Sequence, residues 1–327
     1  MESGIVSYQP LLTIAIPTWN RDETLDTALS HLIPQLHEFE NEVELVVSDN
    51  GSDDNTNEVI TRHKNTNPHL NFVHNRNEVN IQFFGNFSKC RELATGKYIW
   101  ILSDDDFACD NVVNEIVLNI KKSGQLSCVY LKNNVNVNNL KTASISNEKL
   151  LEMENFSLSL ISAVIFFNDK NNDKFLINKY YNSPFIGFIF LLNSFNSRKE
   201  SLILEGKCLM GANAKATGYN YFDVYVNGMN DVINYMTFIE LSPNVVRHFR
   251  TSYLLKFIRP IYLLYKAENK LTFTNGELSS IAEINTWISK AYSNMSSYWL
   301  FFYPITITPT VILNMALKIK RKTKAFI

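Results

Sequence analysis

The sequence changes from apolar to acidic within residues 98–106, which are Tyr-Ile-Trp-Ile-Leu-Ser-Asp-Asp-Asp. A short run of β-branched and aromatic residues is typical of a strand buried on both faces of a parallel sheet. Three consecutive carboxylates repel one another unless a cation offsets their charge. We therefore predict a buried strand over residues 98–102, whose carboxyl end delivers Asp104, Asp105 and Asp106 to a binding site.

Strand and helix patterns alternate through the first third of the chain, on both sides of this segment. The apolar runs are short and end at polar turns, whereas the segments between them repeat apolar residues at helical spacing. Pro34 is expected to shorten the first helix, and Gly124 to end the last one. This alternation predicts an α/β fold with a doubly wound, mostly parallel sheet flanked by helices. The expected strands are residues 11–16, 43–48, 71–74 and 98–102, and the expected helices are residues 25–36, 83–94 and 111–122.

Composition excludes several classes of protein. The chain has 327 residues, and its 31 Lys and Arg against 32 Asp and Glu give a formal charge of -1, so no strongly basic surface for nucleic acid is expected. The 22 Phe and 15 Tyr exclude an intrinsically disordered chain. Four scattered cysteines without a C-x-x-C pair favour a reducing, cytoplasmic location. We interpret the abundant asparagine as compositional drift.

Polar residues follow three of the predicted strands. Residues 17–21 are Pro-Thr-Trp-Asn-Arg, residues 49–54 are Asp-Asn-Gly-Ser-Asp-Asp, and residues 104–106 are the acidic triplet. Ligands of open parallel sheets bind at these carboxyl ends. One or two carboxylates, with diphosphate oxygens and water, suit a hard divalent ion. The alternative is an acidic turn that caps the next helix.

In order and spacing, these segments resemble the family 2 glycosyltransferases of the GT-A fold. The similarity covers about residues 11–125, through residues 16–21, 47–56, 76–78 and 94–106. The last segment is similar to the subgroup that builds bacterial surface polysaccharides, including abequosyltransferase-like enzymes of O-antigen assembly. The resemblance implies a metal-dependent glycosyltransferase (EC 2.4) that uses a nucleoside-diphosphate sugar, with a pyrimidine nucleotide expected, and Mn or Mg as the divalent metal.

The resemblance also assigns roles by position. Asp106 would hold the metal that bridges the diphosphate, Asp105 would contact the donor sugar, and Asp104 would contact ribose or sugar hydroxyls. Asp49 would accept a hydrogen bond from the base. Structural roles in the core are the alternative for Pro17 and Thr18. The remaining residues of the nucleotide-sugar site are Pro17, Thr18, Asn20, Arg21 and Asn77.

An inverting reaction needs a carboxylate base for the acceptor hydroxyl. The resemblance places it about a hundred residues past the triplet, where Asp223 and Asp231 are the candidates. We favour Asp223, because the tyrosines that flank it suit stacking against a sugar ring. Residues 240–248 are similar to the strand that follows the base, which makes His248 a candidate metal or phosphate ligand. A retaining reaction stays open, and it would not need a base in this role.

We expect three segments: residues 1–130 as the nucleotide-sugar half, residues 131–250 as the acceptor half, and residues 251–327 as a helical, basic extension. The polar stretch 130–155 is expected to be a surface loop or lid. In the extension, apolar residues 298–317 are broken by two prolines and precede a basic cluster, which is typical of an interfacial anchor on an anionic leaflet.

The amphipathic stretch 253–266 also indicates contact with a membrane surface. We therefore expect a cytoplasmic enzyme that is peripheral on the inner face of the plasma membrane. The resemblance implies a polyprenyl-diphosphate-linked saccharide as its acceptor, in O-antigen or capsule synthesis. The alternative is a helical subdomain packed on the core or on a second subunit of a homodimer.

Two other functions are compatible with this site. A sugar nucleotidyltransferase also combines an α/β sheet with carboxylate-held magnesium, but a glycine- and lysine- or arginine-rich loop is expected after its first strand, where this chain has residues 17–20, Pro-Thr-Trp-Asn. A non-catalytic sugar-nucleotide-binding partner in a polysaccharide assembly complex is the second alternative. The intact acidic triplet argues against it.

Overall fold

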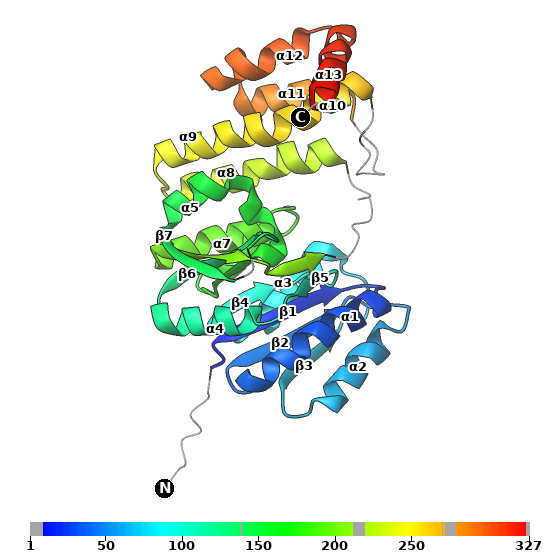
Figure 1. The fold of residues 1–327 in the computed structure, drawn as a ribbon, viewed down its shortest axis with the longest axis vertical. Helices are drawn as coiled ribbons and strands as arrows, with labels where there is room; N and C mark the ends of the chain where they lie inside the picture. The colour runs from blue at the N-terminus through cyan, green and yellow to red at the C-terminus, as the bar shows by residue number, and fades with distance from the viewer. Residues whose placement is uncertain (1–8, 138, 212–219, 270, 272–278, 325–327) are drawn as a thin grey trace. The chain divides into compact units, whose positions relative to one another are not determined.

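The computed structural model describes residues 9–137, 139–211, 220–269, 271 and 279–324. The chain divides into two compact units (Figure 1). Unit 1 consists of Met1–Leu150 and Ser157–Asn213, and unit 2 of Leu151–Phe156 and Ala214–Ile327. Both units include part of the segment 131–250, so the expected acceptor half is not one compact body, and its role in acceptor binding stays a prediction.

The sheet of unit 1 has eight strands in the order β3-β2-β1-β4-β8-β6-β9-β7. β1 pairs in parallel with β2 and β4, and β2 pairs in parallel with β3. β8 runs antiparallel between β4 and β6, β6 pairs in parallel with β9, and β7 is antiparallel to β9. The sheet is therefore mixed, with four parallel pairings among seven. The strands are β1 Leu12–Thr18, β2 Val43–Asp49, β3 Asn71–Arg76, β4 Tyr98–Ile101, β6 Leu126–Asn133, β7 Lys141–Ser146, β8 Val164–Phe167 and β9 Glu200–Gly206.

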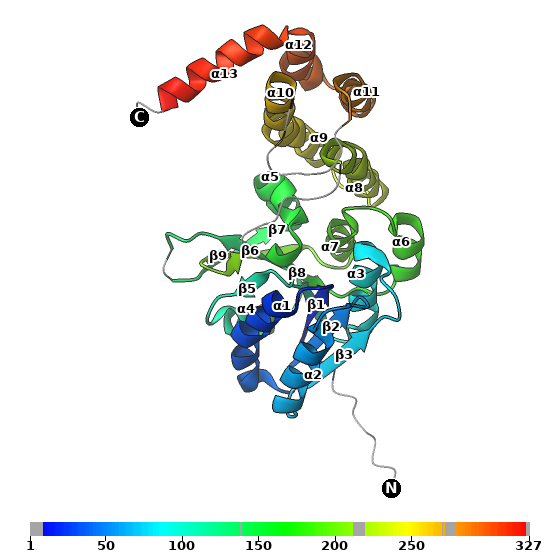
Figure 2. The same cartoon turned by 90° about the vertical axis from the view of Figure 1, so that its right-hand side faces the viewer.

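Helices cover both faces of this sheet (Figures 1 and 2). α1 (Asp22–Leu32), α2 (Thr56–Thr66) and α4 (Val112–Ser123) contribute apolar side chains to one core cluster with alternate residues of β1, β2 and β4. α3 (Gln82–Leu93) contacts β1, β2 and β4, and α7 (Ile186–Ser197) contacts β6 and β8. The rings of Phe87 in α3 and Phe190 in α7 stack at 6.2 Å. The predicted α/β architecture is confirmed.

The four predicted strands and three predicted helices of the first third are present, with shifts of a few residues at their ends. The first helix ends at Leu32 and continues as a 3-10 turn that contains Pro34, as predicted. Gly124 adopts φ 68° at the end of α4, which a residue without Cβ does at little cost.

Two predicted features are wrong. The stretch 130–155 is not a loop, because it contains β7 and α5 (Asn147–Glu154). β7 is an edge strand whose side chains are largely exposed, so it lacks the apolar alternation that identifies a strand. Residues 240–248 are not a strand either, since α9 (Pro243–Ser252) begins there. Ser242 caps it by accepting from the amide of Val245, and proline at the first helical position favours a helix start.

Unit 2 is helical, and its core is aromatic. Tyr253, Leu254, Ile258 and Tyr262 are 0% exposed, so the amphipathic stretch 253–266 belongs to the core of this unit. For this stretch the alternative, a packed helical subdomain, applies. Besides α9, the helices are α8 Gly228–Phe238, α10 Arg259–Glu268, α11 Ile281–Tyr292, α12 Tyr303–Ile307 and α13 Thr310–Lys324, with π-helical turns at Asp223–Asn227, Tyr253–Ile258 and Tyr298–Phe302.

A buried arginine fixes α3, the helix that later contributes to the site. Arg91 is 1% exposed, and its guanidinium donates to the carboxylate of Asp173 at 2.8–3.1 Å and to the carbonyl of Asp169 at 2.7 Å. The same group lies 4.1 Å from the ring centroid of Phe190. Burial lowers the pKa of Arg91, and the nearby carboxylates of Asp173 and Asp169 oppose that shift. The arginine thus ties α3 to the segments after β8.

Replacing Arg91 with Met should lower the free energy of unfolding by about 3–5 kcal/mol, because Asp173 then keeps a partly buried charge without a partner. Arg91→Met with Asp173→Asn should recover part of the loss, since no unpaired charge remains. Lys89→Met is the control: it removes an exposed ion pair with Glu92 in the same helix and should cost at most about 1 kcal/mol. Urea unfolding measures all three, and equal losses for R91M and K89M would contradict the assignment.

Candidate functional site

The parallel pairing of β1 with β4 brings together the polar residues that follow these two strands. The register places Leu12 opposite Tyr98 and Ala15 opposite Ile101. Continued by three residues, it places Thr18 opposite Asp104, and the Thr18 hydroxyl donates to Asp104 Oδ2 at 2.8 Å. A polar pair is thereby fixed at the carboxyl edge of the sheet, where open α/β sheets bind their ligands.

Arg21 neutralises part of the acidic triplet. Its Nη1 lies 2.9 Å from Asp104 Oδ1 and 2.7 Å from Asp105 Oδ2. Asp104 is 6% exposed, and this burial raises its pKa to about 6, against the opposing effects of the Arg21 charge and the Thr18 hydrogen bond. Burial also acts to raise the pKa of Asp105, but hydrogen bonds from Ser103 and Arg21 outweigh it, so the pKa of Asp105 is lowered.

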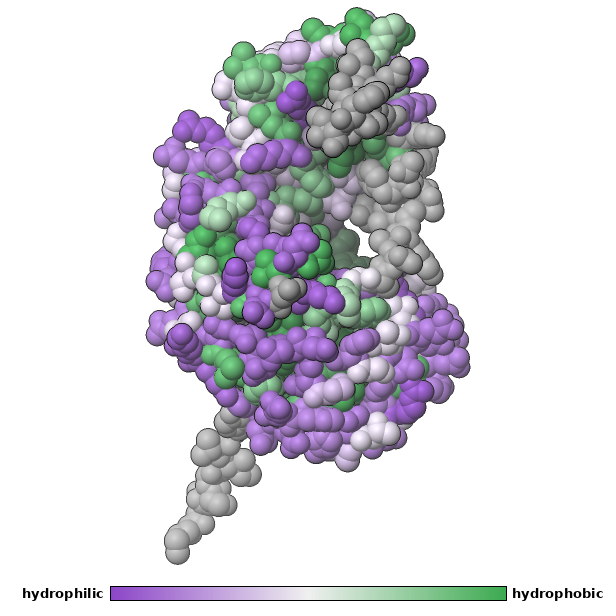
Figure 3. Space-filling view, in the orientation of Figure 1, coloured by the Kyte–Doolittle hydropathy of each residue, from purple (hydrophilic) through white to green (hydrophobic). Residues whose placement is uncertain are grey.

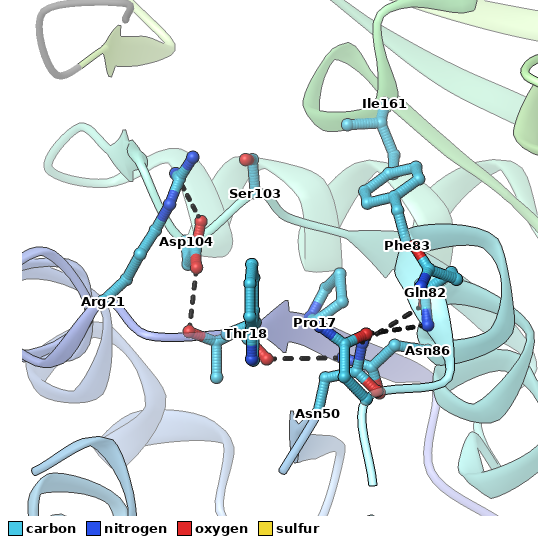
Figure 4. Close-up of a pocket in the computed structure, with 12 residues that line it drawn as sticks. Pro17, Thr18, Arg21, Asn50, Gln82, Phe83, Asn86, Ser103, Asp104 and Ile161 are labelled. Atoms are coloured by element: carbon cyan, nitrogen blue, oxygen red, sulfur yellow. Dashed lines mark hydrogen bonds and ion pairs between the residues drawn. The ribbon is translucent and has the colours of Figure 1, made fainter. Parts of the chain in front are cut away.

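A cavity of about 310 Å³ opens above these groups (Figure 4). Arg21, Asp104 and Ser103 lie along one side of it, and Asn50, Gln82 and Asn86 lie along the other. The cavity therefore combines one cation, one carboxylate, several amides and exposed rings, which is a set of groups suited to a polar ligand with a planar part. Its lining residues are Pro17, Thr18, Trp19, Arg21, Asn50, Asn80, Gln82, Phe83, Asn86, Ser103, Asp104 and Ile161.

Asn50, Asn80 and Asn86, which line the cavity, form with Asn77 a hydrogen-bonded network that holds β2, β3 and α3 together. We call this network the amide wall. Asn86 donates to the carbonyl of Ser48 at 2.8 Å and accepts from the Ser48 hydroxyl at 2.6 Å. Asn77 donates to the side-chain oxygens of Asn50 and Asn86, and Asn50 donates to Asn80 at 2.8 Å. Compositional drift does not account for these asparagines, because each has defined partners. Sequence reasoning missed Asn50, Asn80 and Asn86 as site residues. Asn50 directly follows β2, which was a signal, whereas Asn86 lies inside α3, where no local signal marks it.

Two tight turns position the loop after β2. Asp49 is 0% exposed, and its Oδ1 accepts from both the amide and the hydroxyl of Ser52. Gly51 has φ 70°, and a Cβ there would lie 3.1–3.3 Å from backbone atoms of residues 77–80. Asn20 has φ 51°; its backbone N–H donates to the Ser52 hydroxyl, and its side-chain oxygen accepts from the backbone N–H of Asp53. These contacts lock the loops after β1 and β2 to each other.

Asp106 begins a separate two-stranded ribbon. β5 (Asp106–Ala108) pairs antiparallel with β10 (Leu209–Gly211), and Asp106 faces Gly211 in the register. Burial raises the pKa of Asp106, and a hydrogen bond with Ser162 opposes the shift. Among the described residues, no group of three or more His, Cys, Asp or Glu side chains is arranged to hold a metal ion.

The acidic triplet still fits a divalent cation that takes only one or two of its ligands from the protein. The triplet has three carboxylates and Arg21 supplies one positive charge, so negative charge remains next to the cavity. Mg²⁺ and similar ions are commonly bound by one or two carboxylates, with substrate phosphates and water as the other ligands. Asp105 and Asp106 can supply those carboxylates, whereas a site built from protein ligands alone does not fit the described residues.

The comparison with known families decides the class of protein. The family model "Glycosyl transferase family 2" matches residues 13–195, which is more than half of the chain. The chain belongs to glycosyl transferase family 2. The matched range contains the whole lining of the cavity and the acidic triplet. The predicted family is therefore confirmed.

Curated relatives match the glycosyltransferase over part of their length. It is 38% identical over 96 residues to abequosyltransferase RfbV of Salmonella typhimurium, covering 29% of this chain and 28% of that protein. It is 28% identical over 138 residues to chondroitin synthase of Escherichia coli, covering 41% of this chain and 18% of that protein. The chain thus spans less than a third of the length of either relative.

Solved structures share the fold at low sequence identity. S. aureus TarS 1–349 in complex with UDP-GlcNAc has a TM-score of 0.60 and 14% identity, covering 86% of this chain and 82% of that one. Mannosyltransferase PcManGT from Pyrobaculum calidifontis, in complex with GDP-Man and Mn²⁺, has a TM-score of 0.51 and 12% identity, covering 94% and 88%. The GT-A fold predicted for the glycosyltransferase is confirmed.

The structure places the predicted site residues in three groups. Pro17, Thr18, Arg21 and Asp104 line the cavity of the glycosyltransferase. The second group is not part of that lining, and the contacts of its members with a donor stay predictions. They are Asn20, Asp49, Asn77, Asp105 and Asp106.

The third group lies in unit 2. Asp223 accepts from Asn227 at 2.8 Å, Asp231 lies in the first turn of α8, and His248 lies in α9 with its Nε2 3.3 Å from the Ser252 hydroxyl. Their roles as base and metal ligand stay predictions. Of the two tyrosines near Asp223, residue 219 lies outside the described residues. Tyr221 is 5% exposed and contacts the ring of Tyr225 at 4.3 Å, so it is not an open platform for a sugar.

The raised pKa of Asp104 predicts a change of stability with pH. Because the folded carboxyl binds its proton more tightly than the unfolded one, the free energy of unfolding should fall as pH rises from about 4 to about 6. The contribution is about 3 kcal/mol, at 1.36 kcal/mol for each pKa unit. Asp104→Asn should lack this contribution, and unfolding at a series of pH values measures it.

Asp110→Asn is the control, since Asp110 is exposed and lies outside the cavity. This variant should keep the pH dependence of the wild type. Parallel curves for the wild type and D104N would mean that Asp104 titrates at its ordinary pKa.

Proposed function

We propose that this glycosyltransferase transfers a sugar from a nucleoside-diphosphate sugar to a hydroxyl of a saccharide acceptor. The observation that carries the proposal is the Thr18–Asp104–Arg21 network inside the cavity at the carboxyl edge of β1 and β4. Two proteins of similar fold bind UDP-GlcNAc and GDP-Man, which supports the same class of donor. Family membership argues against a nucleotidyltransferase.

The nucleotide is assigned to the amide side of the cavity. Phe83 lies there and is 54% exposed, and Trp19, also part of the lining, is 48% exposed; such rings can cover the face of a planar base, a contact that proteins use for every nucleobase. Asn50 positions this side, because its side-chain NH2 donates to Asn80 and to the carbonyl of Gln82 and its oxygen accepts from Asn77 and from the amide of Ile81. We assign the side-chain NH2 of Asn80 to a carbonyl of the pyrimidine, since its oxygen already accepts from Asn50 and from the amide of Gln82. Asp49 Oδ2 is buried and lies 3.5 Å from Arg76 Nε, an ion pair without a hydrogen bond, and we assign it to a base N–H.

The sugar and diphosphate are assigned to the acidic side. Asp104, held by Thr18 and Arg21, accepts from a hydroxyl of ribose or of the sugar, and Asp105 contacts the sugar. Asp106, with Asp105, would hold Mn²⁺ or Mg²⁺, and the manganese in a mannosyltransferase structure of similar fold supports the use of a divalent cation. When bound, such a cation stabilises negative charge on the leaving diphosphate.

The acceptor hydroxyl requires a base if the reaction inverts the anomeric carbon. A carboxylate in hydrogen-bond reach of the hydroxyl removes its proton as the new glycosidic bond forms and the bond to the diphosphate breaks. Asp223 remains our first candidate and Asp231 the second. The α8 region supports Asp223 in one respect: Asn227 orients its carboxylate at 2.8 Å, as a positioned base requires.

The acceptor class is proposed from the curated relatives. One of these relatives is named for the transfer of abequose, a sugar, and the other for the synthesis of chondroitin, a polysaccharide. We propose a lipid-linked saccharide acceptor, of the polyprenyl-diphosphate type, in the synthesis of a bacterial surface polysaccharide such as O-antigen or capsule. His248, a candidate contact for a metal or a phosphate, is assigned to the binding of this acceptor.

Binding of UDP, CDP, GDP and dTDP, measured by calorimetry with and without Mn²⁺, tests the donor site. One pyrimidine nucleotide should bind more tightly with Mn²⁺, because the cation relieves repulsion between the diphosphate and the triplet. Asp106→Ala should lose at least about tenfold of that affinity, near 1.4 kcal/mol. Asp110→Ala removes an exposed carboxylate four residues away and should bind like the wild type.

Failure of all four nucleotides to bind to folded protein would overturn the donor site. Metal-dependent binding without turnover of any donor would favour the non-catalytic partner. Binding that D106A and D110A leave equal would remove Asp106 from the metal site.

Release of nucleoside diphosphate in the presence of donor and acceptor tests the base. Asp223→Asn should lower kcat by about 10²–10⁴-fold with donor affinity unchanged, because it keeps the shape of the side chain but cannot take a proton. Asp231→Asn is the matched comparison in the same helical region. If D231N causes the larger loss, the assignment moves to Asp231, and if neither variant does, both candidates are wrong.

A further inference from the structure

Large apolar side chains gather on the surface of unit 2 near its C-terminal end. Their exposed fractions range from 37% to 66%. Figure 3 shows hydrophobic residues at the top of the view, where Figure 1 places α12 and α13. We call this set the C-terminal apolar surface; it comprises Trp299, Leu300, Phe301, Tyr303, Ile307, Val311, Ile312 and Met315.

The helical segment Tyr298–Ile307 is apolar on all sides. Tyr298, Phe302 and Ile305 face the core of unit 2 and are at most 8% exposed. Leu300 and Phe301 point away from that core, at 66% and 52% exposure. A helix that is hydrophobic all round normally buries its second face as well, and soluble monomers rarely expose contiguous apolar patches larger than a few hundred Å². The outward face therefore requires a second apolar partner.

The shape of this segment suits the plane of a membrane interface. Within the described residues, no single helix is long and apolar enough to cross a bilayer. The pair Tyr298–Ile307 and Thr310–Lys318 meets the length and composition requirement only together, and it bends by 105° at the break that contains Pro309 (Figure 2). Helices that lie in the interface bury one apolar face at the boundary of head groups and acyl chains.

The stretch of sequence that bears this surface carries charge of one sign. After Glu283 the sequence has no Asp or Glu, and it carries Lys290, Lys318, Lys320, Arg321, Lys322 and Lys324. Lysine and arginine next to an apolar anchor attract anionic lipids. A second copy of the chain would bring two such basic ends together, which opposes dimerisation through this surface. The partner that complements both the apolar face and the charge is an anionic bilayer.

A cavity in the same unit offers a place for a lipid phosphate. It has a volume of about 550 Å³, and Arg247, Arg250, Ser296 and Ser297 are among its lining residues. Ser297 is 9% exposed, and its hydroxyl has no hydrogen-bond partner among the described residues. Arg250 Nε is also buried without a hydrogen-bond partner among these residues. The helix that bears Trp299 begins beside these serines, and the amides at a helix start favour an anion.

We propose that unit 2 docks on an anionic lipid bilayer. The C-terminal apolar surface enters the boundary between head groups and acyl chains, the basic end faces anionic head groups, and the Arg247–Arg250 cavity receives a lipid phosphate. Docking requires neither donor nor acceptor, so it stands independently of the catalytic assignment.

Co-sedimentation of the full chain with vesicles tests this proposal. The protein should bind vesicles of phosphatidylcholine with phosphatidylglycerol at least tenfold more tightly than phosphatidylcholine alone, and salt should weaken the binding. Leu300→Ser with Phe301→Ser should reduce binding at least tenfold. Leu118→Ser is the control, because Leu118 is 49% exposed in α4 of unit 1 and should not matter. Circular dichroism and unfolding midpoints establish that the variants are folded.

Arg247→Gln separates the phosphate site from the apolar anchor. Arg247 is exposed, and its guanidinium donates to Asn244. This variant should lose part of the preference for phosphatidylglycerol while retaining the weak binding to phosphatidylcholine. No change would exclude the cavity from lipid binding.

Three results would overturn the docking itself. The wild type fails to bind anionic vesicles, or the double serine variant binds them like the wild type. In the third, light scattering shows a dimer that the double serine variant dissociates, which would identify a second copy as the partner of the surface.

Discussion

The parallel pairing of β1 with β4 is the constraint on which the site depends, and it is set at the opposite end of the strands. Buried Glu44 accepts from the hydroxyl of Thr13 and from the amide and hydroxyl of Thr95. Gly96 approaches so closely that a Cβ would lie 2.5 Å from the amide nitrogen of Thr13. This junction fixes the start of β4 beside β1, and the register carries that alignment to Thr18 and Asp104.

The electrostatics of the site follow from that alignment. Asp104 is buried because it lies just past the end of a central strand, and it tolerates burial because Arg21 and Thr18 bind it. Arg21 in turn is held at the start of α1 by the locked loops after β1 and β2. The triplet is therefore not three equivalent carboxylates: the first is buried, the second is paired with Arg21, and the third begins its own ribbon.

Local sequence predicted the parts of the fold in which burial and pattern agree. β1, β2 and β4 are buried on both faces and mostly apolar, Thr18 is the last residue of β1, and Asp104 lies three residues past the end of β4. β7 escaped because an exposed edge strand has no apolar alternation. The amide wall escaped because Asn50, Asn80 and Asn86 meet only in the folded chain. The stretch 253–266 was misleading, since amphipathic character does not distinguish a protein core from a membrane as its partner.

The strand order has a consequence for synthesis on the ribosome. β4 has β1 on one side, but its other neighbour is β8, so the edge of β4 stays unpaired until the chain has been extended from Ile101 to Phe167. Until then the nascent protein presents an apolar strand with free backbone groups, which is a template for wrong pairing between chains. Translation speed and chaperone access over this interval are therefore expected to affect the yield of folded protein, although the interval supplies only Ser103, Asp104 and Ile161 of the cavity's lining.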